Sequence, residues 1–291
     1  MGISIQIVGQ KSSRAFKDSF FRALHHDEHR ALELCSAAEN TNFPLGTPIK
    51  FFTREGASLT RRNNDFACAI AEQLFYFIDH QGTLNPNMPV RFLPNFAEVL
   101  YAWLPDKKIL YRNKLVTIPT PRFFVLYNGK DRVEHSVLRL SDAFKYPVKD
   151  FPCELVVNVI DINYGSGSEI LKKSPTLNGY SYLIAEIRKH TNAGVSRDES
   201  IQRAVNHCIS KDILAEFLKA NFKEVCDMLA WECTYDEELA IQKEEGIEEG
   251  IEEGIFKSAV LLIESGMNFR DVTERLRLTD WQIRELKERM A

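Results

Sequence analysis

Residues 65–81 read DFACAIAEQLFYFIDHQ, the most informative segment of the chain for its fold class. Two apolar runs, at 66–71 and 74–78, flank a polar pair at 72–73. Extended apolar runs of this length separated by a short polar break are typical of two strands joined by a tight turn. The sequence therefore predicts an antiparallel β-hairpin.

Two acidic residues lie at the ends of this predicted hairpin. Asp65 opens the first strand and Asp79 closes the second, so an antiparallel return brings both carboxylates to one edge of the sheet. Strand alternation puts Gln81 on the face of Asp79 and turns His80 to the opposite face, where we expect a packed or hydrogen-bonded imidazole. Spacing alone leaves an alternative of about equal weight, in which Asp65 is a turn residue and Asp79 caps the following loop.

Paired carboxylates at a sheet edge suit phosphodiester hydrolysis. They can hold one or two Mg²⁺ ions, which activate water, neutralise charge and align the displacement. Mg²⁺ or another divalent cation prefers oxygen ligands, which Asp65, Asp79 and the backbone carbonyl of His80 would supply. We therefore expect Asp65, Asp79 and Gln81 to be catalytic, with Gln81 orienting water or phosphate.

The first half of the chain reads as an α/β unit, a mixed sheet flanked by helices. Pro119 and Pro121 favour an edge or a bend over a central position for the strand that contains them. Around the hairpin, the predicted elements are a helix over 12–39, a strand over 49–53, a helix over 90–104, and strands over 115–128 and 155–162.

The second half reads as all helical. Helical spacing is found at about 168–190, 198–208, 211–219 and 221–230, and residues 256–291 read as three short helices that resemble a helix-turn-helix module. With seven basic and six acidic residues, 256–291 favours a packing or partner-binding role over DNA binding.

Between these helical parts, residues 244–255 repeat Glu-Glu-Gly-Ile three times. Glycines four residues apart permit close approach of a second helix, so we expect an oligomerisation helix that pairs copies of the chain. A flexible acidic linker is a nearly equal alternative, because each helical glycine costs about 1 kcal/mol relative to alanine.

Charge and composition limit which classes of protein this chain can belong to. Residues 236–254 hold nine acidic side chains and one lysine, so the net charge of -4 conceals a modestly basic remainder. No apolar run is long enough to cross a membrane and the first residues do not read as a signal peptide, so we expect a cytoplasmic protein without membrane contact. The six cysteines are scattered, which favours reduced packing residues, most of them buried.

Several strings together resemble a known family. They are residues 64–66, 79–92 (DHQGTLNPNMPVRF), 118–129 (IPTPRFFVLYNG), 140–144 (LSDAF) and 163–165 (NYG), with the glycine-spaced acidic repeat. The stretch from about Phe16 to Ile255 resembles the Rpn family of recombination-promoting nucleases, also called PD-(D/E)XK family putative transposases.

The resemblance implies a restriction-endonuclease-like core and a metal-dependent DNA endonuclease associated with recombination or mobile elements. Its first acid falls on Asp65, its second on Asp79 and its terminal polar residue on Gln81. Asp79 is one methylene shorter than the glutamate usual in the family, and Gln81 replaces the lysine of the wider superfamily. The alternative is a catalytically weakened DNA-binding or regulatory protein that retains the fold.

Further predictions concern the surroundings of the site. Asp18 is the candidate accessory acid of an N-terminal helix, and Arg61, Arg62 and Arg91 are candidate DNA contacts, with a separate basic cluster at 107–114. His25, His26 and His29 are expected on a solvated helix face.

We expect a nuclease-like core over 1–165, a helical extension packing on it over 166–240, the glycine-spaced acidic helix or linker over 241–255 and the helical module over 256–291.

Overall fold

The computed structural model describes residues 20–52, 66–130, 133, 135–146 and 153–290, and the chain divides into two compact units, residues 1–232 and 233–291. The strands of the first unit are β1 (Ile49–Phe51), β2 (Phe66–Ile70), β3 (Leu74–Gln81), β4 (Thr120–Tyr127), β5 (Ser136–Arg139) and β6 (Val156–Asp161). Its helices are α1 (Phe20–His25), α2 (Glu28–Glu39), α3 (Met88–Trp103), α4 (Glu169–Lys173), α5 (Pro175–Asn192), α6 (Arg197–Ser210), α7 (Ala215–Ala220) and the start of α8 (Phe222–Glu264), with short 3-10 turns η2 (Lys107–Tyr111) and η3 (Leu140–Ala143).

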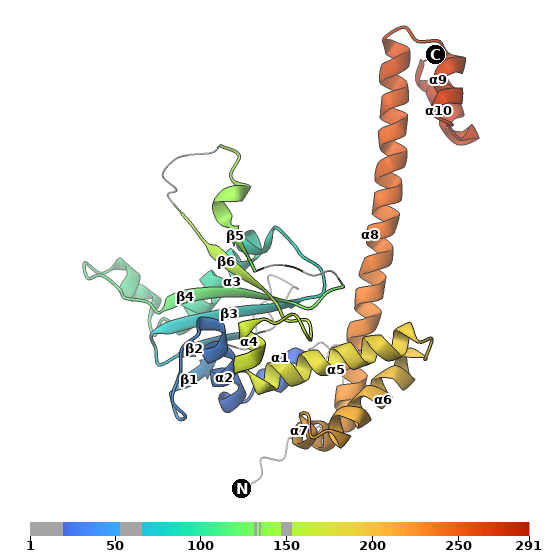
Figure 1. Cartoon of the computed structure of the whole chain (residues 1–291). Coiled ribbons are helices and arrows are strands. Elements are labelled where there is room, and N and C mark those ends of the chain that lie inside the picture. Colours follow the sequence, from blue (N-terminus) through green and yellow to red (C-terminus); the bar gives the residue numbers. More distant parts are fainter. Residues whose placement is uncertain (1–19, 53–65, 131–132, 134, 147–152, 291) are drawn as a thin grey trace, which may run out of the picture. The chain divides into compact units, whose positions relative to one another are not determined.

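The strands form one mixed sheet in the order β1-β2-β3-β4-β6-β5 (Figure 1). β1, β2 and β3 run antiparallel to one another, β3, β4 and β6 are parallel, and β5 returns antiparallel along β6. The predicted α/β class is thereby confirmed. The sequence did not indicate β5, a four-residue edge strand whose side chains are only partly covered.

The predicted hairpin is confirmed. Phe66 pairs with Ile78 and Ile70 with Leu74, so β2 and β3 are adjacent antiparallel strands. Residues 71–73 connect them, with φ angles of 50° at Ala71 and 56° at Glu72 and a hydrogen bond from the Gln73 N–H to the Ile70 carbonyl at 3.0 Å. Positive φ at both central residues is the backbone of the tight turn that matches strand twist, here adopted without glycine.

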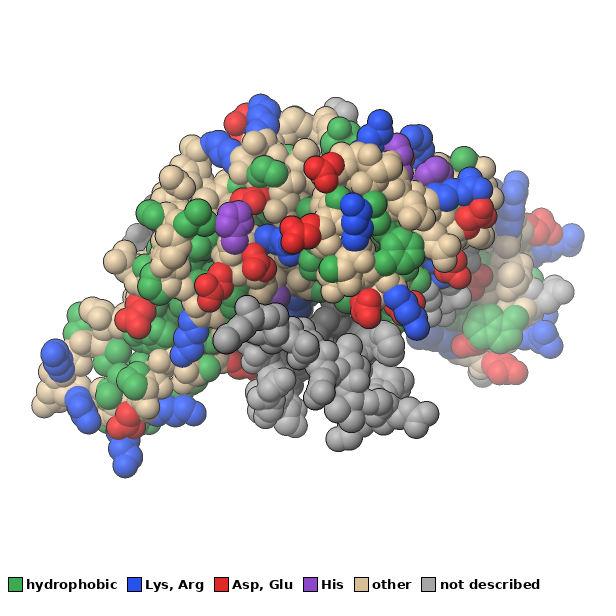
Figure 2. All heavy atoms as spheres, turned by 90° about the horizontal axis from the view of Figure 1, so that it is seen from below, with side chains coloured by type: hydrophobic (Ala, Val, Ile, Leu, Met, Phe, Trp, Pro, Cys, Tyr) green, Lys and Arg blue, Asp and Glu red, His purple; other side chains and the backbone are tan. Residues whose placement is uncertain are grey.

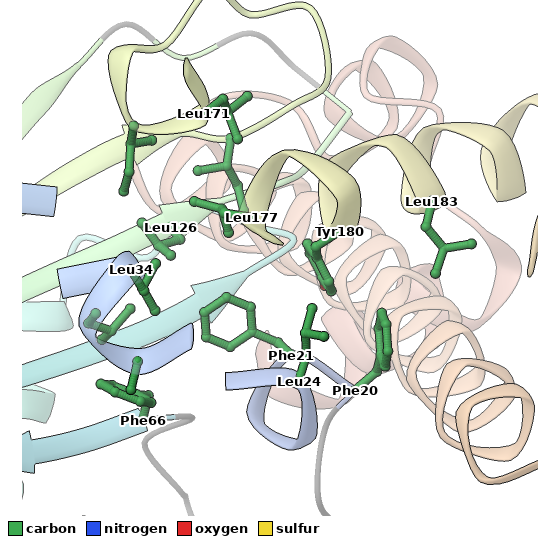
Figure 3. Close-up of a cluster of buried hydrophobic side chains, with 14 of the residues drawn as sticks. Phe20, Phe21, Leu24, Leu34, Phe66, Leu126, Leu171, Leu177, Tyr180 and Leu183 are labelled. Atoms are coloured by element: carbon green, nitrogen blue, oxygen red, sulfur yellow. The ribbon is translucent and has the colours of Figure 1, made fainter. Parts of the chain in front are cut away.

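Alternation along β3 separates two apolar layers. Phe75 and Phe77 pack on one face with α3, while Tyr76 and Ile78 pack on the other with α1, α2 and α5. Figure 3 shows the second layer, where phenylalanines of α1 meet leucines and Tyr180 of α5 above the sheet. Because both faces are covered, the central strand is apolar almost throughout its length.

The predicted helix over 12–39 is interrupted within the described residues. α1 ends at His25, and α2 begins after Asp27, whose side chain accepts a hydrogen bond from the backbone N–H of Arg30 at 3.0 Å. An aspartate in extended conformation that satisfies a free N–H starts a new helix. The prediction of a single helix is therefore wrong.

The break also changes the environment of the histidines. His26 and His29 are exposed as predicted, but His25 is completely buried against Phe21, so its assignment to a solvated face is wrong. Helical spacing could not reveal this, because the bend at Asp27 changes which side of α1 faces the core.

β4 lies in the centre of the sheet, yet the two prolines are tolerated because of where they stand. Pro119 precedes the strand, and Pro121 pairs only with Phe75 of β3, since pairing with β6 begins at Phe123. A missing N–H at Pro121 therefore removes no hydrogen bond to β6. The two prolines therefore indicate the amino-terminal end of a central strand, and the expectation of an edge position for this strand is wrong.

The helical second half is confirmed in outline. The stretch near 168–190 forms two helices, because Ser174 caps α5 by accepting from the N–H of Leu177 and Pro175 follows at the first helical position. α8 runs through the glycine-spaced repeat as one helix, and apart from the adjacent backbone of α8 itself no described atom lies within 4 Å of an added Cβ at Gly250 or Gly254. Pairing of this helix with a second chain stays a prediction.

In the second unit, the end of α8 packs with α9 (Phe269–Arg275) and α10 (Asp280–Met290). The cluster contains Ala259, Val272 and Leu286, each almost fully buried. Two of the three predicted short helices are α9 and α10, but the first is not a separate helix, because α8 continues unbroken from Phe222 to Glu264. None of the helices in the described parts of the chain has the length and apolar character that membrane crossing requires.

Candidate functional site

The candidate site lies at the carboxyl end of β3, where the antiparallel meander meets the parallel strands. β3 leaves the apolar layer at Asp79, and register places Asp79 beside Val125 of β4 and Gln81 beside Tyr127. Open α/β sheets bind ligands beyond the carboxyl ends of their parallel strands. This edge is therefore where polar side chains on neighbouring strands can act together.

Asp79 is almost completely buried, with 2% of its surface exposed, and two side chains contact the same carboxylate oxygen. The Gln81 amide donates from Nε2 to Oδ2 at 2.6 Å, and an Arg91 guanidinium nitrogen lies 3.4 Å from that oxygen. A buried carboxylate needs such partners because burial without them is costly. The prediction that Asp79 and Gln81 share one face is confirmed by their hydrogen bond.

Arg91 reaches Asp79 because α3 begins directly after the loop that follows β3. Pro89 stands in the first turn of α3, where a missing N–H removes no helical hydrogen bond. Arg91 follows two residues later with about 30% of its side chain exposed. The guanidinium thus links the buried carboxylate to solvent and presents positive charge at the edge.

His80 faces the opposite side of the sheet, as predicted. Its Nε2 lies 3.2 Å from the Tyr180 hydroxyl, and its ring stacks on Phe21 with centroids 5.5 Å apart. Burial, with the positive charge of Arg188 and the neighbouring His25, lowers the pKa of His80 to about 4. The half-buried imidazole is therefore neutral near pH 7 and packs against the rings of Phe21 and Tyr180.

A second acid on the face of Asp79 lies two strands away. Asp161 of β6 pairs with Tyr127, which pairs with Gln81, so these three residues form a row across the sheet. Neighbouring strands are about 4.8 Å apart, which puts the backbone of Asp161 about 10 Å from that of Gln81. Its oxygens accept from the backbone N–H of Asn163 at 2.7 Å and of Val133 at 3.3 Å, so Asp161 mainly orders the loops at this edge.

A guanidinium from α5 holds the ends of β4 and β6 together. Arg188 donates to Asn128 Oδ1 and Asn163 Oδ1, both at 3.0 Å, to the Gly129 carbonyl at 3.3 Å and to the Asn128 carbonyl. Asn128 in turn donates its backbone N–H to the Gln81 carbonyl at 2.9 Å. Through this chain of contacts Arg188 positions the strand end that carries Asp79.

Arg188 could not be recognised from the sequence, because nothing local marks its partner loops as neighbours in space. The available signal was that Asn128-Gly129 and Asn163 directly follow two predicted strands. Gly129 is required by space: a Cβ there would overlap the Tyr127 hydroxyl and the Gly82 carbonyl.

The structure brings together three of the predicted site residues, Asp79, Gln81 and Arg91. Asp65, Asp18, Arg61 and Arg62 lie outside the described residues. The first described residue after Asp65 is Phe66, which pairs with Ile78, the residue before Asp79.

The oxygen donors at this edge suit a hard divalent cation, but they are few. Asp79 supplies a carboxylate and Gln81 an amide oxygen that is not used in their mutual hydrogen bond. Among the described residues, no three His, Cys, Asp or Glu side chains gather closely enough to hold a metal ion. A cation at Asp79 would therefore need Asp65 as a further ligand.

Comparisons with models of protein families, with curated proteins and with solved structures found no match to this chain.

Proposed function

We propose that this protein is a metal-dependent DNA endonuclease associated with recombination or mobile elements. The observation that carries the proposal is the contact of Asp79 with Gln81 and Arg91 at the carboxyl edge of β3. An acid and a glutamine from alternate positions of a central strand, beside a partly exposed arginine, supply part of a phosphodiester-cleaving site, and Asp65 would complete the set of metal ligands. A mixed sheet covered by helices on both faces fits the restriction-endonuclease-like core that the family resemblance implies.

Each side chain has a distinct task in this proposal. Asp65, Asp79 and the His80 carbonyl would hold Mg²⁺ or a related ion, which supplies charge neutralisation and an activated water. Gln81 fixes the orientation of the Asp79 carboxylate through its 2.6 Å hydrogen bond and leaves its own oxygen to position a water molecule. Arg91 balances the Asp79 charge in the free protein and would turn its guanidinium to the DNA phosphate when a cation takes over that balance.

One observation favours the alternative of a DNA-binding or regulatory protein with weakened catalysis. Asp79 is short, only 2% exposed and already contacted by two side chains at one oxygen. A cation must displace Arg91 from that oxygen before it can bind there. In this alternative Asp79 is the buried counterion that holds Arg91 in place.

Plasmid nicking separates the two functions. The purified full-length chain is incubated with supercoiled DNA in Mg²⁺, in Mn²⁺ and in EDTA, beside Asp79→Asn and Asp65→Asn. The matched control is Asp142→Asn, the same change at an exposed acid of η3. We expect metal-dependent nicking by the parent chain and the control, and a loss of at least a hundredfold in each site variant.

Direct binding of metal completes the test. Isothermal titration with Mn²⁺ should give one or two sites that Asp79→Asn abolishes and Asp142→Asn retains. Equal nicking by the parent chain and Asp79→Asn would refute the catalytic assignment. DNA binding with neither nicking nor metal uptake would establish the weakened alternative.

A further inference from the structure

The segment between α3 and β4, residues 104–119, is a projection from the sheet that we name the basic arm. Its sequence contains four basic residues, Lys107, Lys108, Arg112 and Lys114, and one acid, Asp106. Only Leu104 and Pro119 at its two ends are buried. Figure 1 shows the arm leaving the sheet at the amino end of β4.

Large apolar side chains on the arm point to solvent. Tyr111 is 88% exposed and Leu115 is 87% exposed, among the highest values for large apolar side chains in the described chain. Leu110 and Ile118 add further exposed apolar surface. In Figure 2, the lobe at the left, which is the projection at the left of Figure 1, carries basic side chains around apolar ones.

The positive charge of the arm is not neutralised by its own fold. Within the described residues, none of the four basic side chains forms an ion pair with an acid. Asp106 accepts from the backbone N–H of Lys108 at 2.9 Å and so caps η2. The Lys107 ammonium lies 5.3 Å from the centre of the Tyr101 ring, a contact that keeps it near an aromatic surface.

We infer that the basic arm binds a single-stranded segment of nucleic acid, with its lysines on phosphates and Tyr111 stacked on an unpaired base. Cations interleaved with exposed aromatic rings are the arrangement that binds single strands with little sequence preference. A duplex keeps its base faces stacked inside, so it leaves Tyr111 without a partner. A lipid surface needs a larger apolar face than these few side chains offer.

The arm lies at the end of the sheet away from Asp79. β4 starts at Thr120, which pairs with Leu74, and Asp79 lies five residues further along β3. At about 3.3 Å per residue the two places are about 17 Å apart along the strand. The arm is therefore an anchoring surface outside the candidate site.

Binding of labelled oligonucleotides to the full chain tests the arm. Fluorescence anisotropy is measured in EDTA with a 20-nucleotide single strand and with the matching duplex, over a series of salt concentrations. The test variant is Lys107→Gln/Lys108→Gln/Lys114→Gln. Its matched control is Lys211→Gln/Lys219→Gln/Lys223→Gln, which removes the same charge from exposed lysines of the α6–α8 region.

The arm variant should bind the single strand at least tenfold more weakly. The negative slope of log K against log salt should become shallower by about 2, because three phosphate contacts are lost. The control should change affinity less than twofold. Tyr111→Ala should weaken single-strand binding by about fivefold or more through lost stacking and leave duplex binding within twofold.

Equal affinities for the arm variant and its control would overturn the inference, and so would an unchanged single-strand affinity of Tyr111→Ala. Sedimentation with phosphatidylserine vesicles in the absence of oligonucleotide binding would overturn it in favour of a membrane surface. The inference rests on the proposed function for the choice of nucleic acid as partner. Because binding is measured without metal, arm-dependent binding with no nicking would refute the nuclease proposal alone.

Discussion

Acidification should destabilise this protein through His25. The side chain is completely buried and its Nδ1 lies 2.9 Å from the Phe21 carbonyl, while no described residue forms a hydrogen bond with its Nε2. Burial, opposed by the Phe21 hydrogen bond and reinforced by Arg30, lowers the pKa of His25 to about 4. The folded chain therefore keeps the imidazole neutral at pH values where the unfolded chain takes up a proton.

Proton linkage gives the direction and the size of the change in unfolding free energy with pH. The unfolded histidine has a pKa of 6.5, so between pH 6.5 and 4 the unfolded state binds more protons and stability falls as the pH falls. At pH 5 the loss relative to pH 8 is about 2 kcal/mol, and it reaches about 3 kcal/mol below pH 4. His80, whose pKa is also lowered to about 4, acts in the same direction.

Urea unfolding followed by tryptophan fluorescence at pH 8, 7, 6 and 5 measures this effect. His25→Leu removes the buried imidazole and should flatten the pH dependence by about 2 kcal/mol over that range. His29→Leu makes the same change at an exposed histidine of α2 and should leave the pH dependence like that of the parent chain. Parallel curves of unfolding free energy against pH for His25→Leu and the parent chain would show that His25 does not cause the loss of stability.

Two further substitutions probe the edge of the sheet. Gly129→Ala places a methyl group against the Tyr127 hydroxyl and the Gly82 carbonyl, so the free energy of unfolding should fall by about 1–3 kcal/mol in urea titrations; an unchanged midpoint would contradict this packing. Arg188→Lys loses the forked contacts to Asn128, and calorimetry should show a lower Tm, with about 2 kcal/mol lost. A Tm equal to that of the parent chain would show that the guanidinium does not hold the strand ends.

Local sequence patterns were sufficient to predict the two strands that carry the candidate site. Period-two alternation from Phe75 to Gln81 fixed which side chains share a face, because strand geometry leaves only two directions for a side chain. The polar break at Glu72 fixed the hairpin, and the hydrogen bond between Asp79 and Gln81 follows from that alternation.

Features that depend on distant parts of the chain were beyond such rules. The burial of His25 follows from the bend at Asp27, and the role of Arg188 from its reach to Asn128 and Asn163, 60 and 25 residues away in sequence. Contacts of this kind are set by how helices pack on the sheet, which sequence spacing does not encode.

The α/β class, the hairpin and the face that Asp79 shares with Gln81 follow from local sequence, because neighbouring residues set backbone geometry and side-chain direction. The ion pair of Arg91 with Asp79 and the support that Arg188 gives to the strand ends depend on how distant parts of the chain pack together. Such contacts are set by folding, since a buried charge takes its partner from whatever groups the fold brings within hydrogen-bonding distance.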